Sequence, residues 1–179
     1  MQLKEKYKKE VVPALKKEFG IKNVFAVPTI KRVTVSVGIS AKQKDTKIME
    51  TAEDTLRRIT GQKAVRTKAK QSIAGFKIRE GNVVGLMVTL RGQRMWDFLT
   101  KLTQVTFPRV RDFRGIPRTL VDKSGNISIG FKENLAFPEI RPDEVDRIHG
   151  LQITISTNAG SREIGTKLYE GLGFPFMNE

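Results

Sequence analysis

The sequence predicts an α+β fold, with a single antiparallel-rich sheet and helices packed on one of its faces. Short segments of strand-like alternation and segments of helical periodicity follow one another along the whole chain. Neither an internal repeat nor a low-complexity tract interrupts them. The length of 179 residues and the 39% share of hydrophobic residues suffice for one substantial core. We therefore expect residues 1–179 to form a single domain.

The first two predicted elements are a helix and a strand. Residues 3–19 place an apolar side chain at every fourth position, which predicts an amphipathic helix with a basic outer side. Pro13 is expected to kink or split this helix, and Gly20 is expected to end it. In residues 30–37, valines alternate with polar side chains, which predicts a half-buried strand with one polar face.

The middle of the chain predicts a helix followed by a hairpin. Asp45 is placed to cap a helix that ends at Gly61. Residues 64–67 and 83–90 have the composition of strands. The glycine-containing residues 72–82 between them predict a long, mobile loop.

The remaining elements continue this alternation. Residues 94–104 and 161–171 have the apolar spacing of helices, and residues 127–131 and 151–156 are strand-like. Residues 107–118 are rich in proline, glycine and arginine, so an irregular basic segment is expected there.

Positive charge is concentrated in two parts of the chain. Lys and Arg number 33 against 19 Asp and Glu, a formal net charge of +14. Residues 1–44 carry 11 basic and 3 acidic side chains, and residues 61–118 carry 13 and 3. Residues 119–179 carry 6 basic and 9 acidic side chains. Clustered cations with few compensating carboxylates are typical of a protein that binds a polyanion.

Several kinds of chemistry lack the residues that they need. The chain has no cysteine, which excludes disulfides, thiolate nucleophiles and cysteine-based metal sites. His149 is its single histidine and is expected at a turn or on the surface. No phosphate-binding glycine motif occurs, and the acidic residues Glu139, Asp143, Glu144 and Asp146 lack the spacing of a calcium loop. We expect a protein that is not an enzyme and that holds no cofactor or metal.

The sequence also favours a soluble protein. Its longest apolar stretch, residues 83–90, is too short to span a bilayer. The residues that follow Met1 are too charged for a secretory signal. We therefore expect a cytoplasmic protein without a membrane partner.

Two stretches are candidates for contact with RNA, and each has a second interpretation. Residues 62–71 combine Lys, Arg, Thr and Gln without an acid, which suits phosphate and 2′-hydroxyl groups but also suits a charge-protected edge strand. The loop at residues 72–82 is either an RNA-contacting loop or a connector whose Phe76 and Ile78 pack into the core. Trp96 is expected in the core.

Blocks along nearly the whole chain resemble the bacterial ribosomal protein L-five family, whose members carry 5S ribosomal RNA on the large subunit. The blocks are Ala26–Ile39, Ile59–Gly81, Val88–Gly92, Met95–Leu99, Pro108–Gly115, Gly125–Asn126, Phe137–Ile140 and Gly173–Phe176. The resemblance implies a non-catalytic protein of the central protuberance, with an antiparallel sheet that carries helices on one side.

The resemblance also implies three contact regions. The polar positions with which the family contacts RNA correspond to Ser36, Gln62 and Thr89. The neighbours that would assist them are Lys63, Arg66, Thr67, Lys68 and Arg91. Its loop near the elbow of peptidyl-site transfer RNA falls on residues 72–82, with Gly75, Phe76, Lys77 and Arg79. Its intersubunit bridge to a protein of the small-subunit head falls on Arg109, Arg111, Asp112, Phe113 and Arg114.

Two positions depart from the pattern of the family. Ser36 stands where asparagine is usual, and it keeps one donor and two lone pairs but loses the reach of an amide. Ile127 stands where an aromatic residue is usual. Phe113, which has three arginines as neighbours, is expected to be exposed.

The hypothesis from the sequence is a structural protein of the large ribosomal subunit that binds 5S ribosomal RNA and large-subunit ribosomal RNA. Three alternatives stay open at this point. The chain is a generic basic RNA-binding protein, or an RNA-acting enzyme that uses Asp112 or the acidic turns. As a third interpretation, residues 3–19 provide part of a membrane-surface helix.

Overall fold

The computed structural model describes residues 3–39, 46–141 and 148–177. By their internal contacts, the residues group into two compact units. Unit 1 consists of Met1–Val33, Leu90–Ile129 and Thr154–Glu179. Unit 2 consists of Thr34–Thr89 and Gly130–Ile153. Several strands contribute residues to both units, because the boundaries of the units fall inside them.

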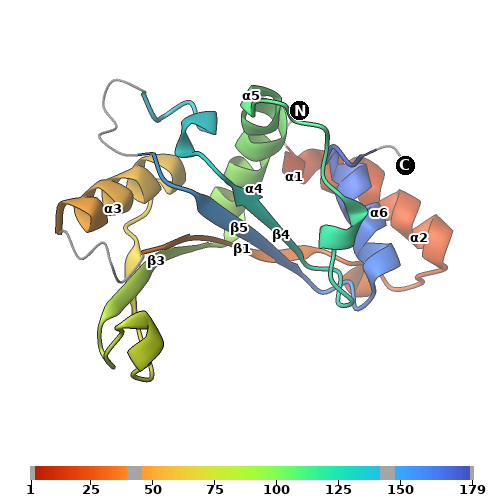
Figure 1. The fold of residues 1–179 in the computed structure, drawn as a ribbon. Helices are drawn as coiled ribbons and strands as arrows, with labels where there is room; N and C mark the ends of the chain where they lie inside the picture. The colour runs from red at the N-terminus through yellow and green to blue at the C-terminus, as the bar shows by residue number, and fades with distance from the viewer. Residues whose placement is uncertain (1–2, 40–45, 142–147, 178–179) are drawn as a thin grey trace. The chain divides into compact units, whose positions relative to one another are not determined.

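The strands form a five-stranded antiparallel sheet in the order β2-β3-β1-β5-β4 (Figure 1). Their bounds are β1 (Ile30–Gly38), β2 (Val65–Lys68), β3 (Val83–Leu90), β4 (Ile127–Phe131) and β5 (Leu151–Thr157). The predicted α+β class and antiparallel sheet are confirmed, and each predicted strand lies within about two residues of its observed bounds. In β1 the alternation acts as expected, because Val33, Val35 and Val37 are buried while Thr34 and Ser36 are half-buried.

The N-terminal helical region of unit 1 contains a wide turn that the sequence did not indicate. It comprises α1 (Leu3–Lys6), a π-helical turn over Tyr7–Val11, and α2 (Val12–Phe19). Pro13 lies inside a continuous helical run, because the residue before α2, Val11, is itself helical, with a φ of -72° and a ψ of -45°. A proline there lacks the N–H of a helical hydrogen bond. The chain stays helical through Pro13, and the π turn that ends two residues before the proline is the local irregularity at the predicted kink. Gly20 ends α2 with a φ of 63°, as expected for a left-handed cap.

The second helical region of unit 1 is longer than predicted. It runs through α4 (Gly92–Lys101), a π-helical turn over Leu102–Thr106, and α5 (Phe107–Arg109). The expectation that the segment from residue 107 onward is irregular is therefore wrong for its first three residues. Pro108 follows the π-helical turn within this continuous run, and the helix ends one residue after it, at Arg109. Trp96 is buried, as predicted, and packs against Tyr7 with ring centroids 5.5 Å apart.

The last helix, α6 (Arg162–Leu172), is fixed to unit 1 by a buried tyrosine. Burial raises the pKa of Tyr169 well above its ordinary value, so the phenol stays protonated even in solutions alkaline enough to ionise an exposed tyrosine. Its hydroxyl donates to the carbonyl oxygens of Gly125, at 3.2 Å, and Ile155, at 3.3 Å. Its ring meets Phe174 edge-on, with centroids 5.3 Å apart. One side chain thus connects α6 to a turn, to β5 and to the C-terminal segment.

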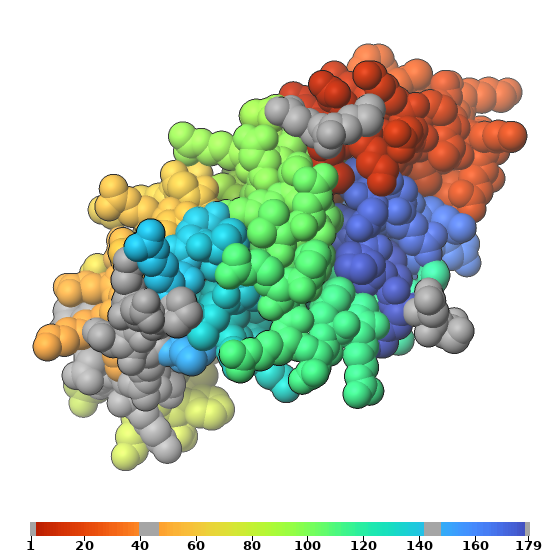
Figure 2. All heavy atoms as spheres, turned by 90° about the horizontal axis from the view of Figure 1, so that it is seen from above, coloured from red at the N-terminus to blue at the C-terminus, as the bar shows by residue number. Residues whose placement is uncertain are grey.

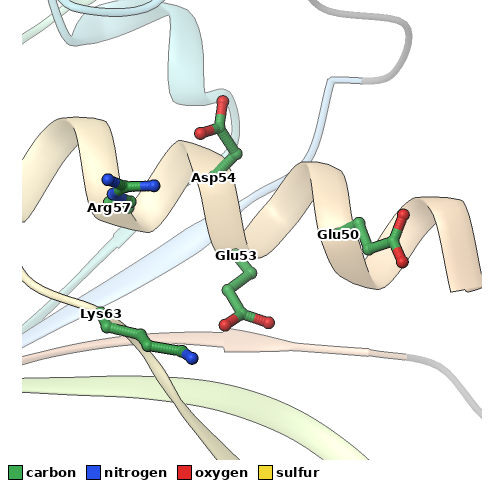
Figure 3. A pocket seen from close by; sticks show the side chains of 5 residues that line it. All are labelled: Glu50, Glu53, Asp54, Arg57 and Lys63. Carbon is green, nitrogen blue, oxygen red and sulfur yellow. The ribbon is translucent and has the colours of Figure 1, made fainter.

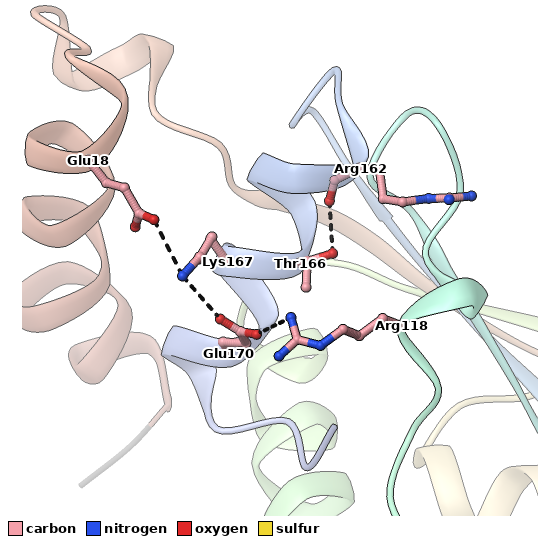
Figure 4. A network of polar contacts seen from close by, with 6 residues as sticks. All are labelled: Glu18, Arg118, Arg162, Thr166, Lys167 and Glu170. Carbon is pink, nitrogen blue, oxygen red and sulfur yellow. Dashed lines mark hydrogen bonds and ion pairs between the residues drawn. The ribbon is translucent and has the colours of Figure 1, made fainter. Parts of the chain in front are cut away.

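A charged network lies on the outer side of α6 (Figure 4). The ammonium group of Lys167 is 3.4 Å from a carboxylate oxygen of Glu18 in α2 and 3.7 Å from one of Glu170. Glu170 also pairs with Arg118 at 2.6 Å. These groups are partly exposed, so each pair contributes at most about 1 kcal/mol. The network orients α6 against its neighbours more than it stabilises them.

In unit 2, α3 (Thr46–Thr60) covers one face of the sheet (Figure 1). Ala52, Leu56 and Ile59 point into the core and are almost fully buried. The predicted helix is confirmed, whereas its proposed cap at Asp45 lies outside the described residues.

We expect Tyr169→Phe to lower the free energy of unfolding by about 1–2 kcal/mol, because the change removes the donor to two buried carbonyl groups. Urea denaturation followed by circular dichroism measures the change. The control is Ser128→Ala, which removes an exposed hydroxyl from β4 and should change the value by less than about 0.5 kcal/mol. Equal stability of Tyr169→Phe and wild type would show that the phenol contributes only through its ring.

Candidate RNA interface

The register of β2 on β3 defines which side chains share the face of the sheet opposite α3. Val65 pairs with Met87, and Thr67 pairs with Gly85. Directly opposed residues in an antiparallel pair lie on the same face, and every second residue along a strand returns to it. Leu86 and Val88 are buried on the other face. We call the opposite one the outer sheet face; in unit 2 it consists of Thr34, Ser36, Val65, Thr67, Gly85, Met87 and Thr89.

The outer sheet face is accessible and carries unused hydrogen-bonding groups. Val65 is 63% exposed and Met87 36% exposed. Ser36, Thr67 and Thr89 are half-buried, and their hydroxyl groups have no hydrogen-bond partner among the described residues. A face that offers hydroxyl groups beside exposed apolar side chains suits sugar hydroxyls and unstacked bases better than it suits a protein core.

Gly85 leaves one position of this face without a side chain. A Cβ atom there would lie 2.8 Å from the carbonyl oxygen of Val37 and 3.1 Å from Oγ1 of Thr67. The first distance is shorter than a Cβ atom tolerates, and the atom in contact belongs to the backbone, which cannot move away easily. The glycine therefore permits the close approach of β1 and β3 beneath the outer sheet face.

Gln62 and Thr89, which the resemblance assigned to one contact, do lie together. The side-chain amide of Gln62 donates to the carbonyl oxygen of Thr89 over 3.5 Å. The backbone of Gln62 is fixed by Thr60 at the end of α3, whose hydroxyl accepts from Gln62 N at 3.3 Å. The end of a helix thus places Gln62 beside the last polar residue of β3.

Arg66 differs from its predicted neighbours, because it points away from the outer sheet face. It opposes Leu86, and its guanidinium group donates twice to the same carboxylate oxygen of Glu53 in α3, at 2.9 and 3.2 Å. This pairing uses its positive charge within the protein. The structure therefore does not bring Arg66 together with Ser36 and Thr67.

Lys63 lines a groove of about 530 Å³ beside α3 (Figure 3). The other residues that line it are Glu50, Glu53, Asp54 and Arg57. In this view Glu53 and Lys63 extend from facing sides of the groove. Three carboxylates disfavour a phosphate group there, so the groove is a poor RNA site. Lys68, in contrast, is exposed and has no ion-pair partner among the described residues.

The loop at residues 72–82 is structured at its base and exposed at its tip. Ile73 and Ile78 form an isolated bridge, with Ile73 N donating to Ile78 O at 2.9 Å. Between them a 3₁₀ turn spans Ala74–Phe76, and Lys77 follows it with a left-handed φ of 54°. Phe76 is 69% exposed, so the interpretation that its ring packs into the core is wrong. The tip thus presents one aromatic ring and the cation of Lys77 to solvent.

The arginines of the segment at residues 109–114 in unit 1 are exposed, and its aromatic ring packs inward. The stretch around residues 109–118, in green in the space-filling view, extends side chains beyond its surroundings (Figure 2). Phe113 is half-buried and stacks on buried Phe107, with centroids 5.3 Å apart. The expectation that Phe113 is exposed is wrong, because the ring anchors the turn from below. Asp112 has a left-handed φ of 52° beside it.

Arg91 directly follows β3 and belongs to unit 1, where it is exposed at the start of α4.

Sequence reasoning missed Val65 and Met87 as members of the outer sheet face. The alternation of β3 contained the signal for Met87, since Met87 and Thr89 are two residues apart and must share a face. The exposure of Val65 follows from the pairing register, which the sequence does not specify.

Groups that would support other chemistry are scarce in the described part of the chain. No cluster of three or more His, Asp or Glu that could hold a metal occurs there. No helix in it is long and apolar enough to cross a membrane. His149, expected at a turn or on the surface, is half-buried, and burial lowers its pKa. Of the acidic cluster, Asp143, Glu144 and Asp146 lie outside the described residues.

Fold and interface together define a class of protein: a basic α+β chain that presents an open, hydroxyl-bearing sheet face. Comparison with known proteins identifies the family within this class. Residues 23–79 match the family model described as ribosomal protein L5, and residues 83–176 match the model of the C-terminus of the same ribosomal family.

Three similar proteins are each called large ribosomal subunit protein uL5. The one from Campylobacter lari is 51% identical over 98% of this chain and 97% of its own length. One from Streptococcus thermophilus is 48% identical, and one from Campylobacter jejuni is 49% identical, with the same coverage. The chain therefore belongs to the ribosomal protein L5 family.

We expect Gly85→Ala to lower the free energy of unfolding by about 1–3 kcal/mol, because the new methyl group would collide with the backbone of β1. Gly130→Ala in β4 is the control, since a Cβ atom there meets nothing within 4 Å, and its effect should stay below about 0.5 kcal/mol. Chemical denaturation of both variants tests the difference. Equal effects would mean that the sheet relaxes around the methyl group without cost.

Proposed function

We propose that this protein is a non-catalytic component of the large subunit of the cytoplasmic ribosome, and that it binds 5S ribosomal RNA through the outer sheet face. Membership of the ribosomal protein L5 family and relatives named as large-subunit proteins support the assignment to the subunit. The observation that carries the RNA contact is the set of free hydroxyl groups on Ser36, Thr67 and Thr89.

In the proposed mechanism, one set of residues supplies the affinity for RNA and another fixes the position of the RNA on the sheet. Exposed cations such as Lys68 neutralise phosphates and release counterions, which supplies affinity without sequence preference. The hydroxyl groups and the amide of Gln62 bond sugar and base edges of a non-helical RNA loop, which fixes the register. The hydroxyl groups of Ser36, Thr67 and Thr89 reach less far than the amide of Gln62, so their RNA partners must approach the sheet closely.

Two further contacts belong to this proposal. The tip formed by Gly75, Phe76, Lys77 and Arg79 reaches the backbone of peptidyl-site transfer RNA. Its exposed ring and its cations support this role. The turn with Arg109, Arg111, Asp112 and Arg114, held from below by Phe113, meets a protein of the small-subunit head. The presence of arginines on an anchored turn supports that role.

We expect Gln62→Ala to weaken binding of 5S ribosomal RNA by about 5- to 50-fold, because its loss strands polar RNA groups inside the interface. Thr67→Val, which keeps the shape of the side chain, should weaken binding by a smaller factor in the same direction. Filter binding against 5S ribosomal RNA and an unrelated transcript of equal length measures both, with Ser128→Ala as a surface hydroxyl control. If the unrelated transcript loses affinity equally, Gln62 does not read the RNA.

We expect Lys68→Gln and Arg66→Gln to differ in their effect on the salt dependence of RNA binding. Lys68→Gln removes an unpaired cation and should lower the slope of log affinity against log salt by about 0.7–0.9. Arg66→Gln should change the slope much less, because Glu53 already compensates this guanidinium group. Titrations from about 50 to about 300 mM KCl provide the slopes. Equal slopes for the two variants would show that Arg66 leaves Glu53 to bind phosphate.

A further inference from the structure

A short turn in unit 1 holds an aromatic ring almost completely in solvent. The 3₁₀ turn Val24–Ala26 precedes β1, and Phe25 within it is 95% exposed. Its neighbour Val24 is exposed as well. Exposed apolar side chains forgo the stabilisation that burial provides, so two adjacent ones on one turn indicate a contact surface.

The ring is exposed although the turn that carries it is firmly held. The side-chain oxygen of Asn23 accepts from Phe25 N at 2.9 Å, and Asn23 O accepts from Ala26 N at 3.1 Å. The residues that follow are buried, and the hydroxyl of Tyr7 donates to Pro28 O at 2.8 Å. Thr29 exchanges two hydrogen bonds with Asn158. Fraying therefore does not explain the exposure, because both sides of Phe25 are fixed.

The charges around this turn indicate what kind of partner binds it. Between residues 19 and 39 the chain has three cations and no acidic residue. These cations, Lys22, Lys31 and Arg32, are all exposed and have no ion-pair partner in the described ranges. An apolar protein pocket would accept the ring but has no need of three uncompensated cations. Unpaired RNA offers both a flat ring to stack on and phosphates to neutralise.

We propose that Phe25 is a stacking platform for an unpaired base of ribosomal RNA, with Lys22 as the nearest cation in sequence to the adjoining phosphates. The proposal rests on the RNA binding proposed above, but it concerns a different site. The outer sheet face belongs to unit 2, whereas this turn belongs to unit 1. The rigid turn lowers the ordering cost of the contact, because the ring is already presented before the RNA arrives.

The test compares Phe25→Ala, Phe25→Trp and wild type as full chains, against purified 5S and large-subunit ribosomal RNA in separate titrations. Phe25→Ala should bind one of the two RNAs about tenfold more weakly, since stacking on a base is lost. Its salt slope should stay unchanged, because no charge is removed. Phe25→Trp should keep wild-type affinity, and its indole emission should be quenched by the same RNA. Wild type reports only buried Trp96, so it supplies the baseline.

Leu120→Ala is the matched control, because Leu120 is another exposed apolar residue of unit 1 and should leave both affinities unchanged. The urea midpoint of Phe25→Ala should equal that of wild type, which separates loss of contact from loss of fold. Unchanged affinity of Phe25→Ala for both RNAs, or unquenched emission of Phe25→Trp, overturns the proposal. So does normal RNA binding combined with failure of Phe25→Ala to enter the large subunit, which would indicate a protein partner.

The same titrations separate this proposal from the function on which it rests. Loss of affinity in Gln62→Ala without loss in Phe25→Ala rejects the stacking site and retains the outer sheet face. If neither RNA binds wild type, the proposed function fails and the stacking site fails with it.

Discussion

One-sided burial of the sheet in unit 2 is the constraint on which the candidate interface depends. The valines of β1 and the alternate apolar residues of β3 are buried on one side, and the strand period of two then forces the hydroxyl-bearing residues to the opposite side. Because Gly85 has no side chain, β1 and β3 approach closely, and no side chain projects from the outer sheet face at that position. A shift of one residue in register would bury the hydroxyl groups and expose the valines.

Unit 1 is organised around a different interaction. Tyr169 connects three backbone segments through its hydroxyl and ring. A Cβ atom on Gly165 would lie 2.6 Å from Cα of Gly125, which shows how closely the two glycines pack. The strong packing inside this unit contrasts with the exposure of Phe25. Packed and exposed side chains also alternate along the chain, since Phe113 stacks on Phe107 while the next residue, Arg114, is exposed.

Periodicity in the sequence was enough to predict the fold class, whereas the candidate site residues Ser36, Gln62 and Thr89 came from the resemblance to the family. The alternation in β1 and the apolar stripe of α3 identified their buried faces correctly, because burial on one side is the main determinant of both patterns. The opposite orientation of Arg66 was not predictable, because it depends on the pairing of β2 with β3 and on Glu53 lying in reach. The stacking of Phe113 on Phe107 was missed for a similar reason, since neighbouring arginines suggested exposure and only the tertiary contact decides it.

The backbone at the tips of two turns limits which residues can occupy them. Lys77 and Asp112 both adopt a left-handed conformation without being glycine, which costs about 1 kcal/mol at each position. Glycine and asparagine fit this geometry readily, whereas valine or isoleucine would strain it further. During divergence of the family, the main-chain conformation therefore limits which residues can replace Lys77 and Asp112, whatever partner these turns bind.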